Sequence, residues 1–366
     1  MVPALAVADA LRARGAEVAF IGARGGSASG RVAAAGYHED RIRLRGLARR
    51  PTPRNLLALA QAAVAVPRAA ALLARRRADV VVGGGGYVAG PVALAAWLTR
   101  RPLLLMEADS HLGFANRLAA PLARRVTLAF PLPGRTGSRY LVTGRPVGRA
   151  VADATRTAGR RAFGIPPEAT VVLVVGGSQG ARTLNVAAVD AFGDDPPFHV
   201  IHVTGPGQLD DTRRMLDGHH AGDRYRLAGW LDDLPDAIAA ADLVISRSGG
   251  SVFELAAIGR PAILVPYPHA TADHQGKNAR WLAETGAAVV LPDADCTGAH
   301  LRELVGALLA DRPRLETMAL AARTAGRPDA ADRVAEEVLA IARRRRRRRL
   351  RRGRGRPRPW RRRKGS

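Results

Sequence analysis

Cysteine, aromatic residues and long apolar runs are all scarce in this chain of 366 residues. The single cysteine, Cys296, cannot form an internal disulfide, which fits a reducing compartment. The first residues, Met-Val-Pro-Ala-Leu-Ala-Val-Ala-Asp, lack the basic segment of a secretory signal peptide. Because no uninterrupted apolar run reaches about 18 residues, we expect no helix to span a membrane.

Acidic residues are few beside the basic ones, and the net charge is +25. Residues 343–366 hold 15 arginines, one lysine and no acid, so this tail carries +16 and the rest of the chain +9. Arginine-rich sequence of low complexity is typical of disordered segments. We expect the tail to be disordered and to attract anionic lipid or nucleic acid. The alternative is a solvated extension without a role.

Short apolar runs alternate with helical patterns, which predicts an α/β protein with parallel sheets. The segment Gly144-Arg145-Pro146-Val147-Gly148 looks like a hinge between two groups of such runs. We therefore expect two Rossmann-like domains with a ligand cleft between them. The expected boundaries are residues 1–147, 148–342 and, for the tail, 343–366.

Residues 246–279 carry the most chemical information. A short apolar run, residues 243–245, leads through glycines into a helical pattern at 252–258. A strand, a glycine turn and a helix together aim backbone N–H groups at an anion. Glu254 lies in the first turns of that helix, where a carboxylate can accept bonds from a sugar diol. A second run, 262–265, ends before Asp273, His274 and Gln275, and the whole suggests a nucleotide-sugar pocket.

Several short motifs add to this pattern: Gly85-Gly86-Tyr87-Val88-Ala89-Gly90-Pro91, Gly176-Gly177-Ser178-Gln179-Gly180-Ala181-Arg182 with Leu184-Asn185, Arg247-Ser248-Gly249, Glu254, and Asp273-His274-Gln275 with Asn278-Ala279. In their order and spacing the chain resembles the MurG family of N-acetylglucosaminyltransferases. The resemblance runs from residue 1 to about 342. It implies a GT-B fold and the conversion of lipid I to lipid II in peptidoglycan synthesis.

The resemblance implies that the second domain binds the donor, UDP-N-acetylglucosamine. The glycine loop would contact the diphosphate, since bulky side chains would block close approach. Glu254 would hold the ribose, His274 and Gln275 the sugar, and Trp230 the uracil, although Trp230 could equally belong to the core. The expected donor-binding residues are Ser178, Gln179, Gly180, Trp230, Leu231, Arg247, Ser248, Gly249, Glu254, His274, Gln275 and Asn278.

The first domain would then bind lipid I at the cytoplasmic face of the cell membrane, with the last helix packed back on it. The apolar segment 56–77 ends in three arginines and is expected to lie in the membrane interface; the alternative is a helix packed on the sheet. Other cell-wall synthesis and division proteins are further expected partners, and a specific nucleic acid is not. The expected acceptor-binding residues are Gly85, Gly86, Tyr87, Asn116, Arg145 and Arg149.

The family implies an inverting transfer to the 4-hydroxyl of the muramyl sugar, with UDP leaving. Its first strand and Gly-Gly-Thr-Gly-Gly-His loop, which holds the usual candidate base, have no counterpart here, so we expect the native start to lie upstream. The candidate bases present are Glu107, Asp109 and His111, although His111 could be a surface residue at a helix start. Asp293-Ala294-Asp295 matches a metal-binding motif of other glycosyltransferases, but we interpret it as a solvated loop and expect no metal and no cofactor.

Three alternatives remain open. A related enzyme could glycosylate another lipid, such as diacylglycerol. An inactive homologue could bind the nucleotide sugar without turnover. A nucleic-acid binder could depend on the arginine tail.

Overall fold

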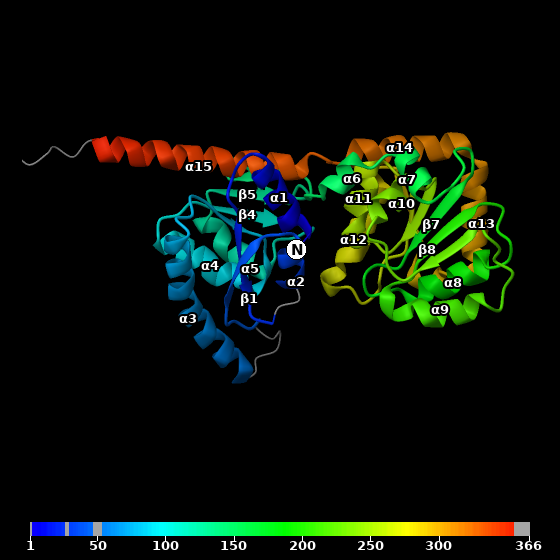
Figure 1. Ribbon diagram of the computed structural model, residues 1–366, viewed down its shortest axis with the longest axis horizontal. Coiled ribbons are helices and arrows are strands. Elements are labelled where there is room, and N and C mark those ends of the chain that lie inside the picture. Colours follow the sequence, from blue (N-terminus) through cyan, green and yellow to red (C-terminus); the bar gives the residue numbers. More distant parts are fainter. Residues whose placement is uncertain (1, 26–28, 47–52, 355–366) are drawn as a thin grey trace, which may run out of the picture. The chain divides into compact units, whose positions relative to one another are not determined.

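The computed structural model describes residues 2–25, 29–46 and 53–354. The chain forms two compact units, one built from residues 3–143 and 331 onward, the other from 144–330. Each unit holds parallel strands covered by helices (Figure 1), so the prediction of a two-domain α/β protein with parallel sheets is confirmed.

The first unit contains a four-stranded parallel sheet of order β3-β4-β5-β6 and a separate parallel pair, β1-β2. Within the described residues, β1 pairs only with β2 and β3 only with β4. The strands are β1 (Ala19–Ala23), β2 (His38–Ile42), β3 (Val81–Gly83), β4 (Leu103–Glu107), β5 (Arg125–Leu128) and β6 (Tyr140–Val142). The helices are α1 (Val2–Ala13), α2 (Ser29–Ala34), α3 (Pro53–Arg75), α4 (Gly86–Leu98), α5 (Phe114–Ala119), η1 (Ala120–Leu122) and α15 (Ala330–Arg354).

All five residues of strand β4 are buried, and four of them are apolar, so both faces of the strand are covered. Successive side chains of a strand point to opposite faces. Leu103 and Leu105 therefore pack with α3 and α4, whereas Leu104 and Met106 pack with α1 and α15. Helix α15 is thus part of the first unit, and Figure 1 shows it lying along that sheet.

The arginine tail begins as helix. Helix α15 continues to Arg354, so residues 343–354 are not the disordered segment we expected, and residues 355–366 lie outside the described part of the chain. Arginine is a good helix former. The helix is also held at Arg346, which pairs with Asp79, and at Arg345, whose Nη1 donates to the Arg100 carbonyl.

Helix α3 differs from expectation in its apolar length. It runs through Pro67 as one helix of 23 residues. Its stretch Asn55–Arg75 is also long and apolar enough to cross a membrane, with a mean hydropathy of 1.8. Gln61 and Arg68 interrupt the apolar run, which is why the count of consecutive apolar residues missed it. Ala65, Ala69 and Leu73 pack in the core of the first unit, so the second half of α3 is anchored on the protein.

The second unit holds a six-stranded parallel sheet of order β12-β11-β10-β7-β8-β9. Its strands are β7 (Val171–Val175), β8 (His199–Val203), β9 (Tyr225–Ala228), β10 (Leu243–Ser246), β11 (Ala262–Leu264) and β12 (Ala288–Val290). Its helices are α6 (Arg149–Asp153), α7 (Arg156–Ala162), α8 (Arg182–Phe192), η2 (Pro206–Gln208), α9 (Leu209–Leu216), α10 (Leu234–Ala240), α11 (Ser251–Ile258), η3 (Thr271–Asp273), α12 (His274–Glu284), η4 (Asp293–Asp295), α13 (Gly298–Ala310) and α14 (Arg312–Ala325).

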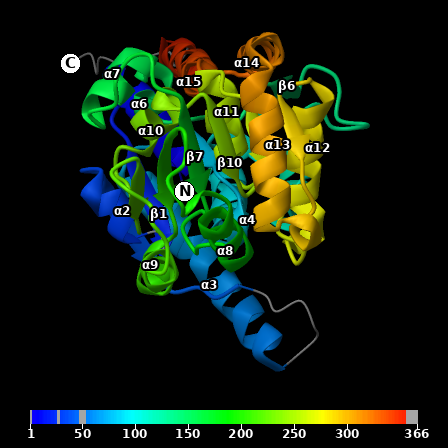
Figure 2. The same ribbon diagram turned by 90° about the vertical axis from the view of Figure 1, so that its right-hand side faces the viewer.

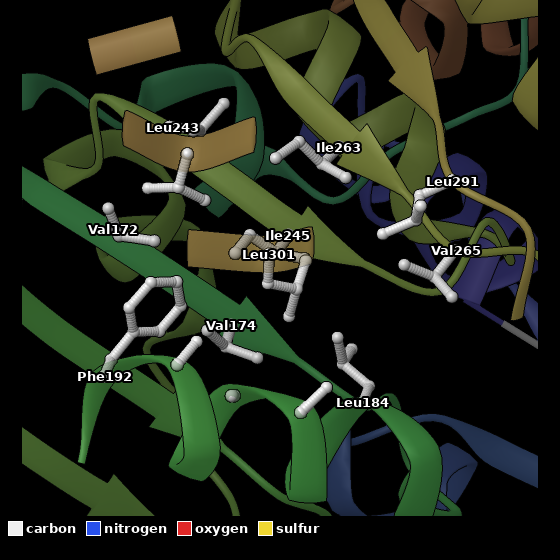
Figure 3. Packing of buried hydrophobic residues seen from close by; sticks show 14 of the residues in the cluster. Val172, Val174, Leu184, Phe192, Leu243, Ile245, Ile263, Val265, Leu291 and Leu301 are labelled. Atoms are coloured by element: carbon white, nitrogen blue, oxygen red, sulfur yellow. The ribbon is translucent and has the colours of Figure 1, made fainter. Parts of the chain in front are cut away.

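Two cores enclose this sheet. Val172 and Val174 of β7 pack with α8 and α13 (Figure 3). Leu173 of the same strand packs with α10, α11 and α12. Figure 2 shows these helices around β7 and β10. The strand order reverses between β7 and β10, which makes this a topological switch point. Ligands of open parallel sheets bind outside the carboxyl ends of the strands at such a point.

Candidate active site

The loop after β7 is built from glycines that the backbone requires. Gly177 and Gly180 have φ angles of 82° and 76°, a region that favours glycine. A Cβ on Gly180 would lie 2.7 Å from the Thr204 carbonyl oxygen. The turn exposes Ser178 and Gln179 and leads directly into α8. The unpaired amides at the start of α8 therefore lie beside the loop and suit an anion.

The loop after β10 is fixed by buried side chains. The Ser248 hydroxyl donates to the Gln275 carbonyl at 2.8 Å, and Asn278 Nδ2 donates to the Ser248 carbonyl at 3.0 Å. Both side chains are almost fully buried. Ser248 and Asn278 thus hold the loop against α12, and Gly249 continues this loop beside them.

Arg247 is paired within the protein. Its Nη1 donates to the Asp293 carboxylate and to the Val265 carbonyl. Asp293 also accepts from the Thr183 hydroxyl at 3.3 Å. The interpretation of residues 293–295 as a solvated loop is therefore wrong for Asp293, because this carboxylate neutralises a largely buried guanidinium and joins the ends of β10 and β12 to α8.

Glu254 lies in the first turn of α11, at the same sheet edge. Burial raises the pKa of its carboxyl above the usual range, and the nearby Arg145 guanidinium opposes that shift. Arg145, expected among the acceptor-binding residues, lies against α11 of the second unit: its guanidinium is 5.3 Å from the Phe253 ring centroid. A Cβ on Gly250 would lie 3.0 Å from that guanidinium. The start of α11 thus combines a desolvated carboxylate with a cation.

The loop after β11 carries the third group of expected donor residues. Ala272 and Asp273 have φ angles of 53° and 52°, which cost free energy in residues other than glycine and cluster at functional sites. The Gln275 side-chain oxygen accepts from the Tyr267 amide at 3.0 Å. His274 and Gln275 then begin α12, half-buried beside the Ser248 loop.

Trp230 is 53% exposed and donates its Nε1–H to Asp232 at 2.9 Å. The alternative that Trp230 belongs to the core is therefore wrong. Leu231, next to it, is half-buried against the core that Leu173 forms with α10, α11 and α12. Both follow β9, at the same carboxyl edge as the loops after β7 and β10.

The first unit presents a second cluster, at the end of β4. The buried Glu107 carboxylate accepts from the Gly113 amide at 2.8 Å and from Asn116 Nδ2 at 3.0 Å. Asn116 Nδ2 also donates to the Met106 carbonyl. Since both partners can only accept, the orientation of the Asn116 amide is determined. Asn116 Oδ1 is then a buried acceptor without a hydrogen-bond partner among the described residues.

The glycine turn of the first unit adjoins this cluster. Gly85 and Gly86 have φ angles of 83° and 74° and open α4, and a Cβ on Gly85 would lie 3.7 Å from Asn116 Nδ2. Tyr87 is partly exposed at the start of the same helix. The Asn116 amide and the glycine turn that opens α4 are therefore neighbours in the first unit.

The remaining expected site residues lie on the surface. Asp109 and His111 are exposed on the β4–α5 loop, whereas Glu107 is committed to holding that loop. Arg149 pairs with Asp153 on the surface of α6. Sequence reasoning missed Asp293 and also Thr204, whose carbonyl backs the glycine loop. Thr204 directly follows β8, and this position at the carboxyl end of a parallel strand was the available signal.

Comparisons with known proteins agree with this geometry. The glycosyltransferase family 28 N-terminal domain matches residues 1–128, and the family 28 C-terminal domain matches 171–334. A UDP-N-acetylglucosamine–N-acetylmuramyl-(pentapeptide) pyrophosphoryl-undecaprenol N-acetylglucosamine transferase of Salinibacter ruber is 41% identical over 93% of this chain and 94% of its own. The enzyme of that name from Alkalilimnicola ehrlichii is 42% identical over 93% and 95%.

Among solved structures, Acinetobacter baumannii MurG is similar with a TM-score of 0.74 and 29% identity, over 92% of this chain and 95% of that one. The glycotransferase of kitacinnamycin, at a TM-score of 0.65 and 19% identity, shares the fold. The expected resemblance is confirmed: the chain belongs to glycosyltransferase family 28 and, within it, to the MurG family of GT-B N-acetylglucosaminyltransferases.

Proposed function

We propose that this protein transfers N-acetylglucosamine from UDP-N-acetylglucosamine to the 4-hydroxyl of the muramyl sugar of lipid I, with inversion, giving lipid II. One observation carries the proposal. At the switch point of the six-stranded sheet, the starts of α8 and α11 and the desolvated Glu254 gather at the carboxyl ends of β7 and β10. Two helix N-termini suit a diphosphate, and a half-buried carboxylate suits a ribose diol.

In this proposal the diphosphate lies at the Gly176–Gly180 loop and the start of α8, where amides stabilise the charge that develops on UDP as it leaves. Glu254 holds the ribose, Trp230 and Leu231 flank the uracil, and His274 and Gln275 bind the sugar. The backbone of Ser248 and Gly249 closes the pocket, shaped by Asn278.

The acceptor half is assigned to the first unit. Asn116 Oδ1, a buried acceptor in need of a donor, would take a hydrogen bond from a hydroxyl or amide of lipid I, and the Gly85–Gly86 turn would face its diphosphate. The 4-hydroxyl oxygen forms the new bond to the anomeric carbon as the bond to UDP breaks. The hydroxyl proton passes to Asp109 or His111, since Glu107 is occupied with loop amides.

Transfer of radiolabelled N-acetylglucosamine tests the proposal, with lipid I and diacylglycerol as alternative acceptors. We expect labelled product with lipid I alone. Labelled diacylglycerol would instead identify a related enzyme acting on another lipid. Binding of UDP-N-acetylglucosamine without transfer to either acceptor would identify an inactive homologue.

We also propose that the first unit binds the cytoplasmic face of the membrane through an apolar face on three neighbouring helices. Helix α4 packs against both α3 and α5. The members of this face are all exposed: Leu56, Leu57, Leu59, Val64, Trp97, Leu98, Phe114 and Leu118. Exposed apolar residues on neighbouring helices are a feature of membrane and protein interfaces.

Vesicle sedimentation tests the apolar face. Replacing Leu56, Leu57 and Leu59 together by serine should weaken binding to phospholipid vesicles at least about tenfold, because burying each leucine in lipid contributes on the order of 1 kcal/mol. L320S, which removes an equally exposed leucine from the second unit, is the matched control and should change nothing. Equal binding by both variants would contradict the assignment.

The basic end of α15 is proposed to add attraction to anionic lipid. Deleting residues 348–366 keeps the docked Arg346 but removes most of the arginine run. We expect weaker binding to anionic vesicles, a difference that fades at high salt, and unchanged transfer activity. Loss of transfer would favour a tail-dependent function such as nucleic-acid binding.

A further inference from the structure

The second unit buries a histidine that the proposed reaction does not use. His202 of β8 is fully buried. Its Nδ1 lies 2.7 Å from the Tyr225 hydroxyl, and its Nε2 lies 3.1 Å from Asn185 Oδ1. Burial lowers the pKa of the imidazole to about 3, so the ring is neutral at neutral pH. A buried polar network of this kind is costly unless every member is satisfied.

The partners determine the direction of each hydrogen bond. Asn185 Nδ2 faces the Thr204 carbonyl at 3.1 Å and Gln208 Oε1 at 2.8 Å. A carbonyl can only accept, so Asn185 Oδ1 must face His202, and Nε2 must carry the imidazole hydrogen. The other ring nitrogen, Nδ1, then accepts from the Tyr225 hydroxyl. Asn185 therefore selects the tautomer of His202, and the Tyr225 hydroxyl, which can donate or accept, donates to Nδ1 and holds the imidazole ring against Asn185.

The far end of this chain of hydrogen bonds reaches the glycine loop. Asn185 holds the Thr204 carbonyl, and a Cβ on Gly180 would lie 2.7 Å from the same carbonyl oxygen. Gly205 contacts Gly180 so closely that a Cβ on Gly205 would lie 2.5 Å from Gly180 Cα. A rotated Asn185 amide would turn an acceptor toward Thr204 and push this turn away from the loop.

We propose that Tyr225, His202 and Asn185 form a buried relay of hydrogen bonds that positions the Gly177–Gly180 loop for the donor diphosphate, with His202 as a positioning residue. The inference rests on the proposed function for its ligand, the diphosphate of UDP. Its structural part, the coupling of the Tyr225 hydroxyl to the loop, stands apart from that function.

The variant Y225F tests the relay, because it removes only the hydroxyl that donates to His202 Nδ1 and leaves this ring nitrogen buried without a donor. We expect the KM for UDP-N-acetylglucosamine to rise about fivefold with kcat nearly unchanged, as loss of one hydrogen bond predicts. Nitrogen–proton correlation spectra of ¹⁵N-histidine-labelled protein should show His202 protonated at Nε2 in the wild type, and Y225F should shift the Nδ1 resonance as this nitrogen loses its hydrogen bond. Hydrogen exchange at the Gly180 amide, which donates to the Gly177 carbonyl, should become faster.

Y37F is the matched control. It also removes a buried tyrosine hydroxyl, which donates to Asp9 at 2.6 Å in the first unit, so it should lower stability without changing the donor KM. H202Q should be milder than H202L, since glutamine can both accept and donate here. An unchanged donor KM and unchanged Gly180 exchange in Y225F would overturn the relay. Failure of the wild type to bind UDP would overturn the proposed function instead, while the exchange and tautomer measurements would still decide the relay.

Discussion

Replacing Glu254 by glutamine should weaken donor binding without disturbing the fold. The carboxyl is desolvated in the first turn of α11, and glutamine keeps its shape. A hydrogen bond to a charged acceptor contributes about 1.5–3 kcal/mol and one between neutral groups about 1 kcal/mol. The difference of about 1.4 kcal/mol predicts a KM for UDP-N-acetylglucosamine raised about tenfold. E284Q, an exposed glutamate of α12, is the control and should leave the KM unchanged.

The pH dependence of donor affinity tests the role of Glu254 a second time. Burial raises the pKa of Glu254, and the proposed ribose contact uses the ionised carboxylate. The affinity for the donor should therefore be highest above that raised pKa and should fall as the pH drops through it. In E254Q this fall in donor affinity at low pH should disappear. The unliganded variant should also melt at a higher temperature at neutral pH, since a buried carboxylate with a raised pKa destabilises the folded state when it is ionised. Competition by 2′-deoxy-UDP refines the test: wild type should prefer UDP more strongly than E254Q does, and an equal preference would refute the ribose assignment.

Two further predictions concern the loops that frame this pocket. D293A should lower the free energy of unfolding by about 3 kcal/mol, because it removes the carboxylate that neutralises the largely buried Arg247 guanidinium. Urea unfolding should show little change for the exposed D295A. G180A should abolish UDP binding in calorimetry, since its φ of 76° and its contact with Thr204 leave no room for a Cβ, whereas G207A, with open space around it, should bind normally. Normal binding by G180A would contradict the geometry of the loop.

The sequence predicts the strands of the second unit closely, because their signal is local. The apolar run at 243–245 became β10 and the helical pattern at 252–258 became α11, with shifts of one residue. The glycines after β7 also predict a turn, because a backbone with positive φ favours glycine.

What the sequence could not predict depends on contacts between distant residues. Asp293 meets Arg247 across 46 positions, and nothing local marks either residue as paired. The orientation of Asn116 follows from Glu107 and Met106, which become its neighbours only when α5 folds back on β4. The beginning of the arginine tail was misjudged from composition, because its helix is stabilised by contacts with Asp79 and Arg100 of the first unit.

Titration calorimetry with uridine nucleotides tests the central claim most directly, that the second unit holds UDP at the ends of β7 and β10. The account predicts that folded protein binds UDP and UDP-N-acetylglucosamine in a one-to-one ratio, and that G180A removes the heat of binding. Absence of any affinity for uridine nucleotides in a folded sample would contradict it.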